Sequence, residues 1–259
     1  KMSKDMQMRN FSHYTYYSYM HKGKEIIEYF NKPIEEVTTE ELRNFLFEHL
    51  INKRKLSDRS VNYYNSVIRF MYEVTMDKLI NKKQLPMRKK KKTVYKVLTK
   101  EELSTFFNCV DNYKFKTIFM IAYGSGLRIG EITNLHISDI DSKKMRIFVR
   151  EGKGNKERYT MLSKTSLEML RTYWKKYRKP VKSDKIFLTE LDEPMTAGVI
   201  RENFRKYRRK AGLNEKVTMH TLRHCYATNL IENGATLIQV KELMGHSNIR
   251  STMEYIHVA

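Results

Sequence analysis

A proline followed closely by a run of basic residues divides this chain into two parts. Pro86 comes shortly before four consecutive lysines, Lys89, Lys90, Lys91 and Lys92. Proline interrupts regular structure and like charges repel, so this stretch is expected to be an exposed connection. We therefore predict a first domain at residues 1–85, a basic linker at 86–97 and a second domain at 98–259. The lysines are either a solvated hinge or, if the partner is DNA, a contact to its phosphates.

The first domain is predicted to be a small helical bundle. Glycine and proline are nearly absent from residues 1–85, and apolar residues recur there at helical spacing. Thr38 and Glu41 have the spacing of a capping box, and Ser57 precedes another periodic apolar stretch. Both signals mark the starts of helices, so residues 1 to about 85 are expected to be helical.

The second domain is predicted to combine helices with a small sheet. Thr99 marks the start of a helix, and residues 145–149 and 157–161 have the pattern of two strands joined by a glycine-containing turn. Further helices are expected at residues 115–123, 166–177, 199–210, 220–233 and 237–243. The predicted fold class is mainly α, with a small antiparallel β-sheet in the C-terminal domain.

The charge of the chain indicates a polyanionic partner. Lys and Arg number 50 against 29 Asp and Glu, which gives a formal net charge of +21. Nucleic acid is the commonest partner of so basic a protein, although a ribosome-associated or secreted cationic factor could have a similar charge. Charge alone separates neither DNA from RNA nor an enzyme from a binding protein.

Cysteine usage and hydropathy favour a cytoplasmic protein. Cys109 and Cys225 are the only cysteines and do not have the spacing of a metal site or a disulfide framework. Both stand in apolar segments and are expected to be small buried side chains. No apolar run approaches the roughly 18 residues of a membrane helix, and residues 1–10 do not resemble a signal peptide.

Two segments of the second domain have residues suited to a phosphate. Gly124 and Gly126 form a turn that opens a helix near Arg128, and backbone amides beside an arginine bind phosphates well. Glu131 lies about one helical turn further on and could orient the guanidinium, although an ordinary surface ion pair has the same spacing. Lys153 lies in the turn between the strands, where it could donate a proton inside a DNA groove or simply be solvated.

Histidine, arginine and tyrosine residues follow towards the end of the chain. His220 and Arg223 are three residues apart, so a proton carrier and an anion-binding group share one helix face. His246 follows a glycine between two helices, and Tyr255 comes nine residues later. Each could be structural by itself. Together, Arg128 and Arg223 could hold one phosphodiester while Tyr255 attacks it, without a metal ion.

Five short motifs occur in this order along the second domain: Gly-Leu-Arg-Ile-Gly-Glu, Gly-Lys-Gly-Asn-Lys-Glu-Arg, His-Thr-Leu-Arg-His, Leu-Met-Gly-His-Ser and Thr-Met-Glu-Tyr. Their order and spacing resemble the signature of the tyrosine recombinases, also called the lambda-integrase family. The resemblance is to the short Xer-like and mobile-element integrases, and it spans most of residues 98–259. The N-terminal part is similar to the SAM-like core-binding domain of that family, with less specific motifs.

The resemblance implies a role for each residue of the site. Arg128 and Arg223 would bind the phosphate, His220 would be a general acid or base, and His246 would hydrogen-bond the phosphate. Tyr255 would form a 3′-phosphotyrosyl bond and release a 5′-hydroxyl, which requires neither a cofactor nor ATP.

The family also implies supporting residues and an assembly. Lys153, rather than Lys156, matches the general acid on the hairpin, and Glu131 matches a supporting acidic position. The two domains would form a clamp on double-stranded DNA, with a tetramer assembling on paired recombination sites. Most relatives have a further C-terminal segment that docks on a neighbouring subunit, whereas this sequence stops at Ala259. Either such exchange does not occur here or the sequence is a piece of a longer chain.

Several biological roles fit this resemblance. Integration, excision or transposition of a mobile element is our first interpretation. The Lys, Asn and Ile content is typical of AT-rich bacterial genomes, so the expected location is the nucleoid of a bacterial cytoplasm. Xer-like resolution of chromosome or plasmid dimers is the alternative. A type IB topoisomerase is disfavoured by His220, where those enzymes usually have lysine, and a DNA-binding protein without catalysis is disfavoured by the complete set of catalytic residue types.

Overall fold

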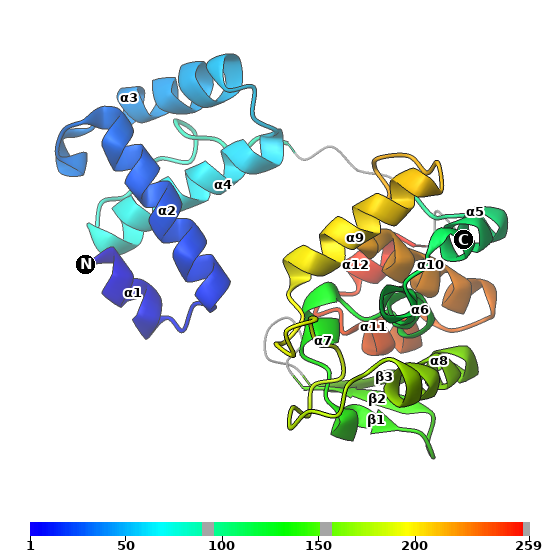
Figure 1. Ribbon diagram of the computed structural model, residues 1–259. Helices are drawn as coiled ribbons and strands as arrows, with labels where there is room; N and C mark the ends of the chain where they lie inside the picture. The colour runs from blue at the N-terminus through cyan, green and yellow to red at the C-terminus, as the bar shows by residue number, and fades with distance from the viewer. Residues whose placement is uncertain (90–95, 151–156, 256–259) are drawn as a thin grey trace. The chain divides into compact units, whose positions relative to one another are not determined.

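The protein is described by a computed structural model that covers residues 1–89, 96–150 and 157–255 (Figure 1). The chain divides into two compact units, residues 1–93 and 94–259, and each has a hydrophobic core of its own. No helix among the described residues is long and apolar enough to cross a membrane.

The N-terminal unit is a helical bundle around a small apolar core. Its buried centre includes Ile26, Leu42, Leu50 and Val67, which come from different helical segments. The segments are α1 (Met2–Met8), α2 (His13–Phe30), the 3₁₀ turn η1 (Ile34–Glu36), α3 (Thr39–Asn44) with its π-helical continuation η2 (Phe45–Lys53), and α4 (Asp58–Arg69) with its π-helical continuation η3 (Phe70–Thr75).

The two predicted helix starts in this unit are confirmed. Thr38 accepts a hydrogen bond from the backbone N–H of Glu41 at 3.3 Å, and the Glu41 carboxylate accepts one from the Thr38 N–H at 2.8 Å. Ser57 caps α4 by accepting from the N–H of Ser60 at 3.3 Å. These caps satisfy amides that have no partner within the first helical turn.

The prediction of helix up to residue 85 is wrong for its last ten residues. Asp77 has a left-handed backbone with φ +56°, and the segment that follows it is not helical. Arg69 donates to the Leu85 carbonyl at 2.7 Å, and Asn62 forms two hydrogen bonds with the backbone of Arg88, at 2.8 and 2.9 Å. These two side chains of α4 thus bond backbone groups of Leu85 and Arg88, which would have partners within the helix if this segment were helical. Lys89 is exposed, while Lys90 to Lys92 lie outside the described residues.

The C-terminal unit is a set of helices beside a three-stranded sheet. The apolar helix α6 (Tyr113–Ser125) packs against α8 (Lys164–Lys176), α9 (Ala197–Lys210) and α10 (Met219–Glu232). The remaining elements are α5 (Lys100–Cys109), α7 (Ile129–Thr133), the 3₁₀ turn η4 (Ile137–Asp139), α11 (Leu237–Met244) and α12 (Arg250–Met253). Figure 1 shows the sheet at one edge of this unit, below α7 and beside α8.

The sheet contains the predicted hairpin and one strand more. Strands β2 (Arg146–Val149) and β3 (Arg158–Met161) pair antiparallel with Ile147 opposite Thr160, which confirms the predicted strands. A two-residue strand, β1 (Ile140–Asp141), adds to β2 and is too short to have a recognisable pattern of its own. The predicted fold class, mainly helical with a small antiparallel sheet, is therefore confirmed.

Candidate active site

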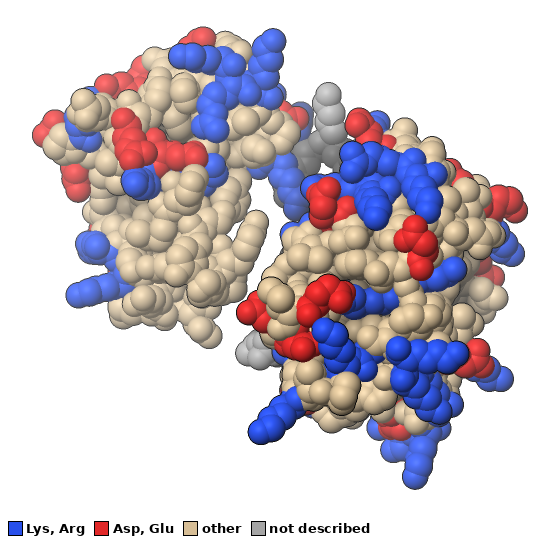
Figure 2. Space-filling view, viewed as in Figure 1, with Lys and Arg blue, Asp and Glu red and all other residues tan. Residues whose placement is uncertain are grey.

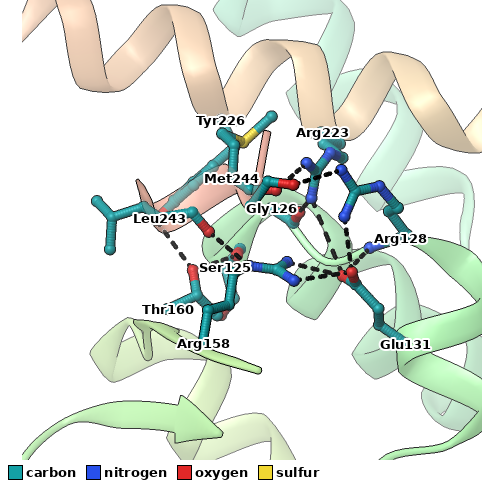
Figure 3. Close-up of polar contacts among 11 residues, drawn as sticks. Ser125, Gly126, Arg128, Glu131, Arg158, Thr160, Arg223, Tyr226, Leu243 and Met244 are labelled. Carbon is teal, nitrogen blue, oxygen red and sulfur yellow. Dashed lines mark hydrogen bonds and ion pairs between the residues drawn. The ribbon is translucent and has the colours of Figure 1, made fainter. Parts of the chain in front are cut away.

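The predicted catalytic residues come from five separate parts of the C-terminal unit, and Figure 3 shows Arg128 and Arg223 among them. Arg128 precedes α7 and Glu131 lies within it, while His220 and Arg223 lie on α10. His246 follows α11 and Tyr255 follows α12, so the fold has to bring these elements together. Lys153 and Lys156 stand between β2 and β3 in the sequence, outside the described residues.

Glu131 is the centre to which the arginines of the site are bound. One of its carboxylate oxygens accepts from Arg128 Nη1 and Arg158 Nη1, both at 2.8 Å. The other accepts from the Arg128 backbone N–H and from Arg158 Nη2, also at 2.8 Å. Burial by itself would raise the pKa of Glu131, but the hydrogen bonds and charges of Arg158 and Arg128 lower that pKa to about 2. The carboxylate is therefore ionised at any physiological pH.

The end of helix α11 is the second feature that organises the arginines. Three consecutive backbone carbonyls, of residues 243–245, would lack intrahelical partners at this C-terminus. Arg158 Nε donates to the first at 2.9 Å, Arg223 Nη2 donates to the second, and Arg128 Nη2 donates to the third at 3.2 Å. Cations at the negative end of a helix dipole are favourably placed. The three guanidiniums are thus held between this helix end and one carboxylate.

Gly245 allows this close approach. Its backbone is left-handed, with φ +61°, and a Cβ added there would lie 2.8 Å from Cδ of Arg158. A side chain at this position would therefore push Arg158 away from the end of α11. The glycine that precedes His246 in the sequence has a packing role as well as a turn role.

Arg223 is the most deeply buried charge of the site, with 1% of its surface exposed. Its Nη1 donates to the Gly126 carbonyl and lies 4.0 Å from the Glu131 carboxylate. Gly126 has φ +62°, and a Cβ there would lie 2.3 Å from the Tyr226 ring, so only glycine fits. Burial, and next the charge of Arg128, lower the pKa of Arg223 to about 9, which still leaves it a cation at neutral pH.

Tyr255 lies beside this cluster and is buried, with 2% of its surface exposed. Its hydroxyl is 3.0 Å from Nδ1 of His224, and its ring is nearly parallel to that of His246, with centroids 6.1 Å apart. His246 in turn is 3.0 Å from the Thr252 hydroxyl through Nδ1. The structure therefore brings His246 and Tyr255 together, next to the carbonyl that Arg128 binds.

Three histidines of the site are held in the neutral form. His220 is exposed at the start of α10, but the protein atoms around its ring and the charges of Arg223 and Arg128 lower its pKa to about 4. Burial is also the largest cause at His224 and His246, whose pKa values fall to about 3. A neutral imidazole can accept a proton, as a general base must.

Two residues of this arrangement were missed by our sequence reasoning. Arg158 stands in the hairpin motif but was given no role there, although it binds both oxygens of Glu131. His224 follows Arg223 directly and reaches the Tyr255 hydroxyl. The charge of Arg158 directly after the hairpin turn, and the spacing of His220 and His224 by one helical turn, were the available signals.

Burial of His224 makes the stability of the protein depend on pH in a way that can be measured. The unfolded chain binds a proton at His224 with a pKa of about 6.5, whereas the folded state holds that pKa at about 3. Its contribution to stability is complete above about pH 6.5 and is lost as the pH falls towards 3, by about 1.4 kcal/mol per pH unit. The melting temperature should therefore fall less steeply from pH 7 to 5 in His224→Gln than in the parent. Equal slopes in calorimetry would contradict this.

Two sequence patterns of known families match this chain. The sequence pattern of the phage integrase family matches residues 96–259, and that of the phage integrase N-terminal SAM-like domain matches residues 1–82. The chain belongs to the phage integrase family. It is a tyrosine recombinase of the lambda-integrase type, an enzyme of site-specific recombination that cleaves and rejoins DNA, as the five motifs predicted.

Relatives of this phage integrase family member include an integrase/recombinase and Xer-type tyrosine recombinases. The chain is 34% identical to a Sinorhizobium fredii protein provisionally assigned as an integrase/recombinase, over 100% of this chain and 83% of that protein. It is 30% identical to tyrosine recombinase XerC of Anoxybacillus flavithermus, over 96% of this chain and 89% of XerC. Its fold is similar to the Tn1549 transposon integrase in complex with a circular intermediate DNA, with a TM-score of 0.79, 21% identity, and coverage of 98% and 92%.

Proposed function

We propose that Tyr255 is the nucleophile of this recombinase and attacks a DNA phosphate held by Arg128 and Arg223. The observation that carries the proposal is the position of Tyr255, which lies against His246. Arg128 and Arg223 come from separate elements and both donate to carbonyls at the end of α11, next to His246. Attack would form a 3′-phosphotyrosyl bond and expel a 5′-hydroxyl. The bond energy is retained in that ester, so rejoining needs no nucleotide cofactor.

The two arginines can supply the electrostatic part of this reaction. A phosphodiester gains negative charge as the tyrosine oxygen approaches, and fixed cations in a site with little water stabilise that charge strongly. Arg128 is one-fifth exposed, so a phosphate can reach it, whereas Arg223 is buried. Glu131 and the Gly245 carbonyl each accept from one terminal nitrogen of the Arg128 guanidinium, and its remaining N–H groups are available for the phosphate.

The tyrosine hydroxyl needs a base and a way to reach the phosphate. We infer that His224, neutral and 3.0 Å away, holds the hydroxyl before DNA binds. Because Tyr255 is buried, we infer that it shifts when DNA binds, so that its oxygen can meet a phosphate. His220 and His246 are the other candidates for proton transfer and phosphate binding, as the family resemblance implies.

Lys153 as the general acid stays a prediction. The turn that holds it lies outside the described residues, but the strand that follows begins with Arg158, whose side chain reaches Glu131. The base of the hairpin therefore adjoins the proposed phosphate site.

Double-stranded DNA with paired recombination sites is the proposed partner. Lys and Arg side chains gather over helix α9 on the face seen in Figure 2, and this helix contains Arg201, Arg205, Lys206, Arg208, Arg209 and Lys210. Such a surface fits a phosphate backbone. We infer a two-domain clamp, a tetramer on DNA with a monomer or weak oligomer in solution, and action at the nucleoid of a bacterial cytoplasm. Phosphate contacts by Lys89 to Lys92 stay predictions that a salt titration of DNA affinity would test.

We further infer that the biological role is integration, excision or transposition of a mobile element. The identity to the S. fredii integrase/recombinase extends over the whole chain and exceeds that to XerC. Resolution of chromosome or plasmid dimers is the alternative role.

Covalent capture tests the proposed function even though the target sequence is unknown. Nicked duplexes of randomised sequence would be incubated with the protein, and complexes that survive denaturation would be isolated and sequenced. We expect DNA linked through a 3′-phosphate to Tyr255, identified by mass spectrometry of the attached peptide, and adducts that form equally in excess EDTA. Linkage to another residue, or complete dependence on Mg²⁺, would contradict the proposal.

A further inference from the structure

Arg158 is an arginine of the site whose side chain is held by contacts within the protein. Its side chain is 8% exposed, and all three guanidinium nitrogens are bonded within the protein. Two of them contact the two oxygens of Glu131, each at 2.8 Å, in the paired geometry that makes arginine–carboxylate bonds strong. The third contacts the Leu243 carbonyl at the end of α11. Arg158 thus differs from Arg223, whose Nε has no hydrogen-bond partner among the described residues and which does not form a paired contact with Glu131.

The charge balance around Glu131 suggests what Arg158 contributes. Three guanidiniums surround this single carboxylate, so the cluster has an excess of positive charge. Arg158 forms the paired contact, Arg128 forms one side-chain contact at 2.8 Å, and Arg223 lies at 4.0 Å. Without Arg158, the buried carboxylate would have only Arg128 and Arg223 as charge partners. Those are the two residues proposed to bind the phosphate. Because leaving a buried carboxylate unpaired is costly, Glu131 would then hold these two arginines more strongly.

We propose that Arg158 is a positioning residue that neutralises Glu131, so that Arg128 and Arg223 remain available to the DNA phosphate. This rests on the proposed function of those two arginines. In its absence, the Glu131 carboxylate competes with the phosphate for both guanidiniums. The defect therefore comes from Glu131, and removing the charge of Glu131 repairs it.

A purely structural role for Arg158 predicts a different result. Arg158 also ties the start of β3 to the end of α11, so its loss could act only by loosening these elements. In that case Glu131→Gln would remove further hydrogen bonds and add to the defect. The sign of the coupling between the two substitutions thus separates the two explanations.

The experiment measures single-turnover adduct formation on a nicked substrate obtained by the covalent capture. We expect Arg158→Gln to slow adduct formation by about 10²-fold, with DNA affinity changed by less than about threefold, because most phosphate contacts lie elsewhere. The double variant Arg158→Gln/Glu131→Gln should regain at least about tenfold over Arg158→Gln. Arg158→Lys, which keeps the charge, should cleave faster than Arg158→Gln.

Arg146→Gln is the matched control. Arg146 lies on the neighbouring strand β2 and pairs with Asp141 at 3.1 Å, so its loss removes an arginine–carboxylate pair that does not involve Glu131. It should form adducts at the parent rate. Melting temperatures of all variants would show that they are folded at the assay temperature.

Two results would overturn the role of Arg158. One is a parent-like rate for Arg158→Gln, and the other is a double variant as slow as Arg158→Gln or slower. If Arg158→Gln does not fold, a rate for Arg158→Lys below about one-hundredth of the parent rate would also overturn it, since the charge is present. Adducts of the parent at Tyr255 in the same assay keep the proposed function separate from these outcomes.

Discussion

Tyr255→Phe is expected to abolish covalent attachment to DNA while DNA binding persists. The substitution removes one oxygen and keeps the ring, which packs in an apolar cluster with Tyr226, Val240 and Met244. Loss of the hydrogen bond to His224 should cost about 1 kcal/mol of stability. Without a nucleophile, adduct formation should fall by more than about 10⁴-fold. Denaturing gels measure the adduct, and gel shifts measure the affinity.

Tyr226→Phe is the control for this variant. Tyr226 is a buried tyrosine of the same cluster, and its hydroxyl lies 3.4 Å from that of Thr160, at the long end of hydrogen-bond distance. The change is chemically identical, so any general effect of removing a buried hydroxyl would appear in both variants. Tyr226→Phe should form adducts at nearly the parent rate. Adducts in Tyr255→Phe would be incompatible with Tyr255 as nucleophile, and their loss in Tyr226→Phe would show that removing a buried hydroxyl of this cluster is enough to stop cleavage.

Local patterns predicted the parts of this molecule that local interactions determine. The capping boxes at Thr38 and Thr99 involve residues three apart, and both are present. The contact between Arg128 and Glu131 spans the same separation and is also present, at 2.8 Å. Such pairs depend on helix geometry alone, so a single sequence suffices to find them.

The rest of the site depends on tertiary packing that no local pattern reports. Arg158 and Glu131 are 27 residues apart, and Arg223 and Gly126 are 97 apart. Residues 221–226 of α10 are all buried, so its apolar spacing does not distinguish an inner from an outer face. The position of His224 against Tyr255, with His220 exposed one turn earlier, could therefore not be read from periodicity.

Arg223→Lys is the second substitution for which a large effect is expected. Lysine keeps the charge, but its single ammonium cannot reproduce the planar fork that donates to both the Gly126 and Met244 carbonyls. We expect adduct formation to fall by about 10³-fold, because a displaced cation no longer meets the charge that develops on the phosphate. The buried carbonyls left unpaired should also lower stability by about 2 kcal/mol.

Arg178→Lys separates these two effects. Arg178 also links backbone carbonyls within the C-terminal unit, those of Ser183 at 2.6 Å and Lys185 at 3.0 Å, but it belongs to none of the contacts around Glu131. Its replacement should lower the melting temperature and leave the rate of adduct formation unchanged at temperatures where the variant is folded. A comparable loss of rate in Arg178→Lys would show that cleavage follows stability alone. A near-parent rate in Arg223→Lys would mean that a cation at this position is sufficient, because the guanidinium fork would then add nothing to phosphate binding.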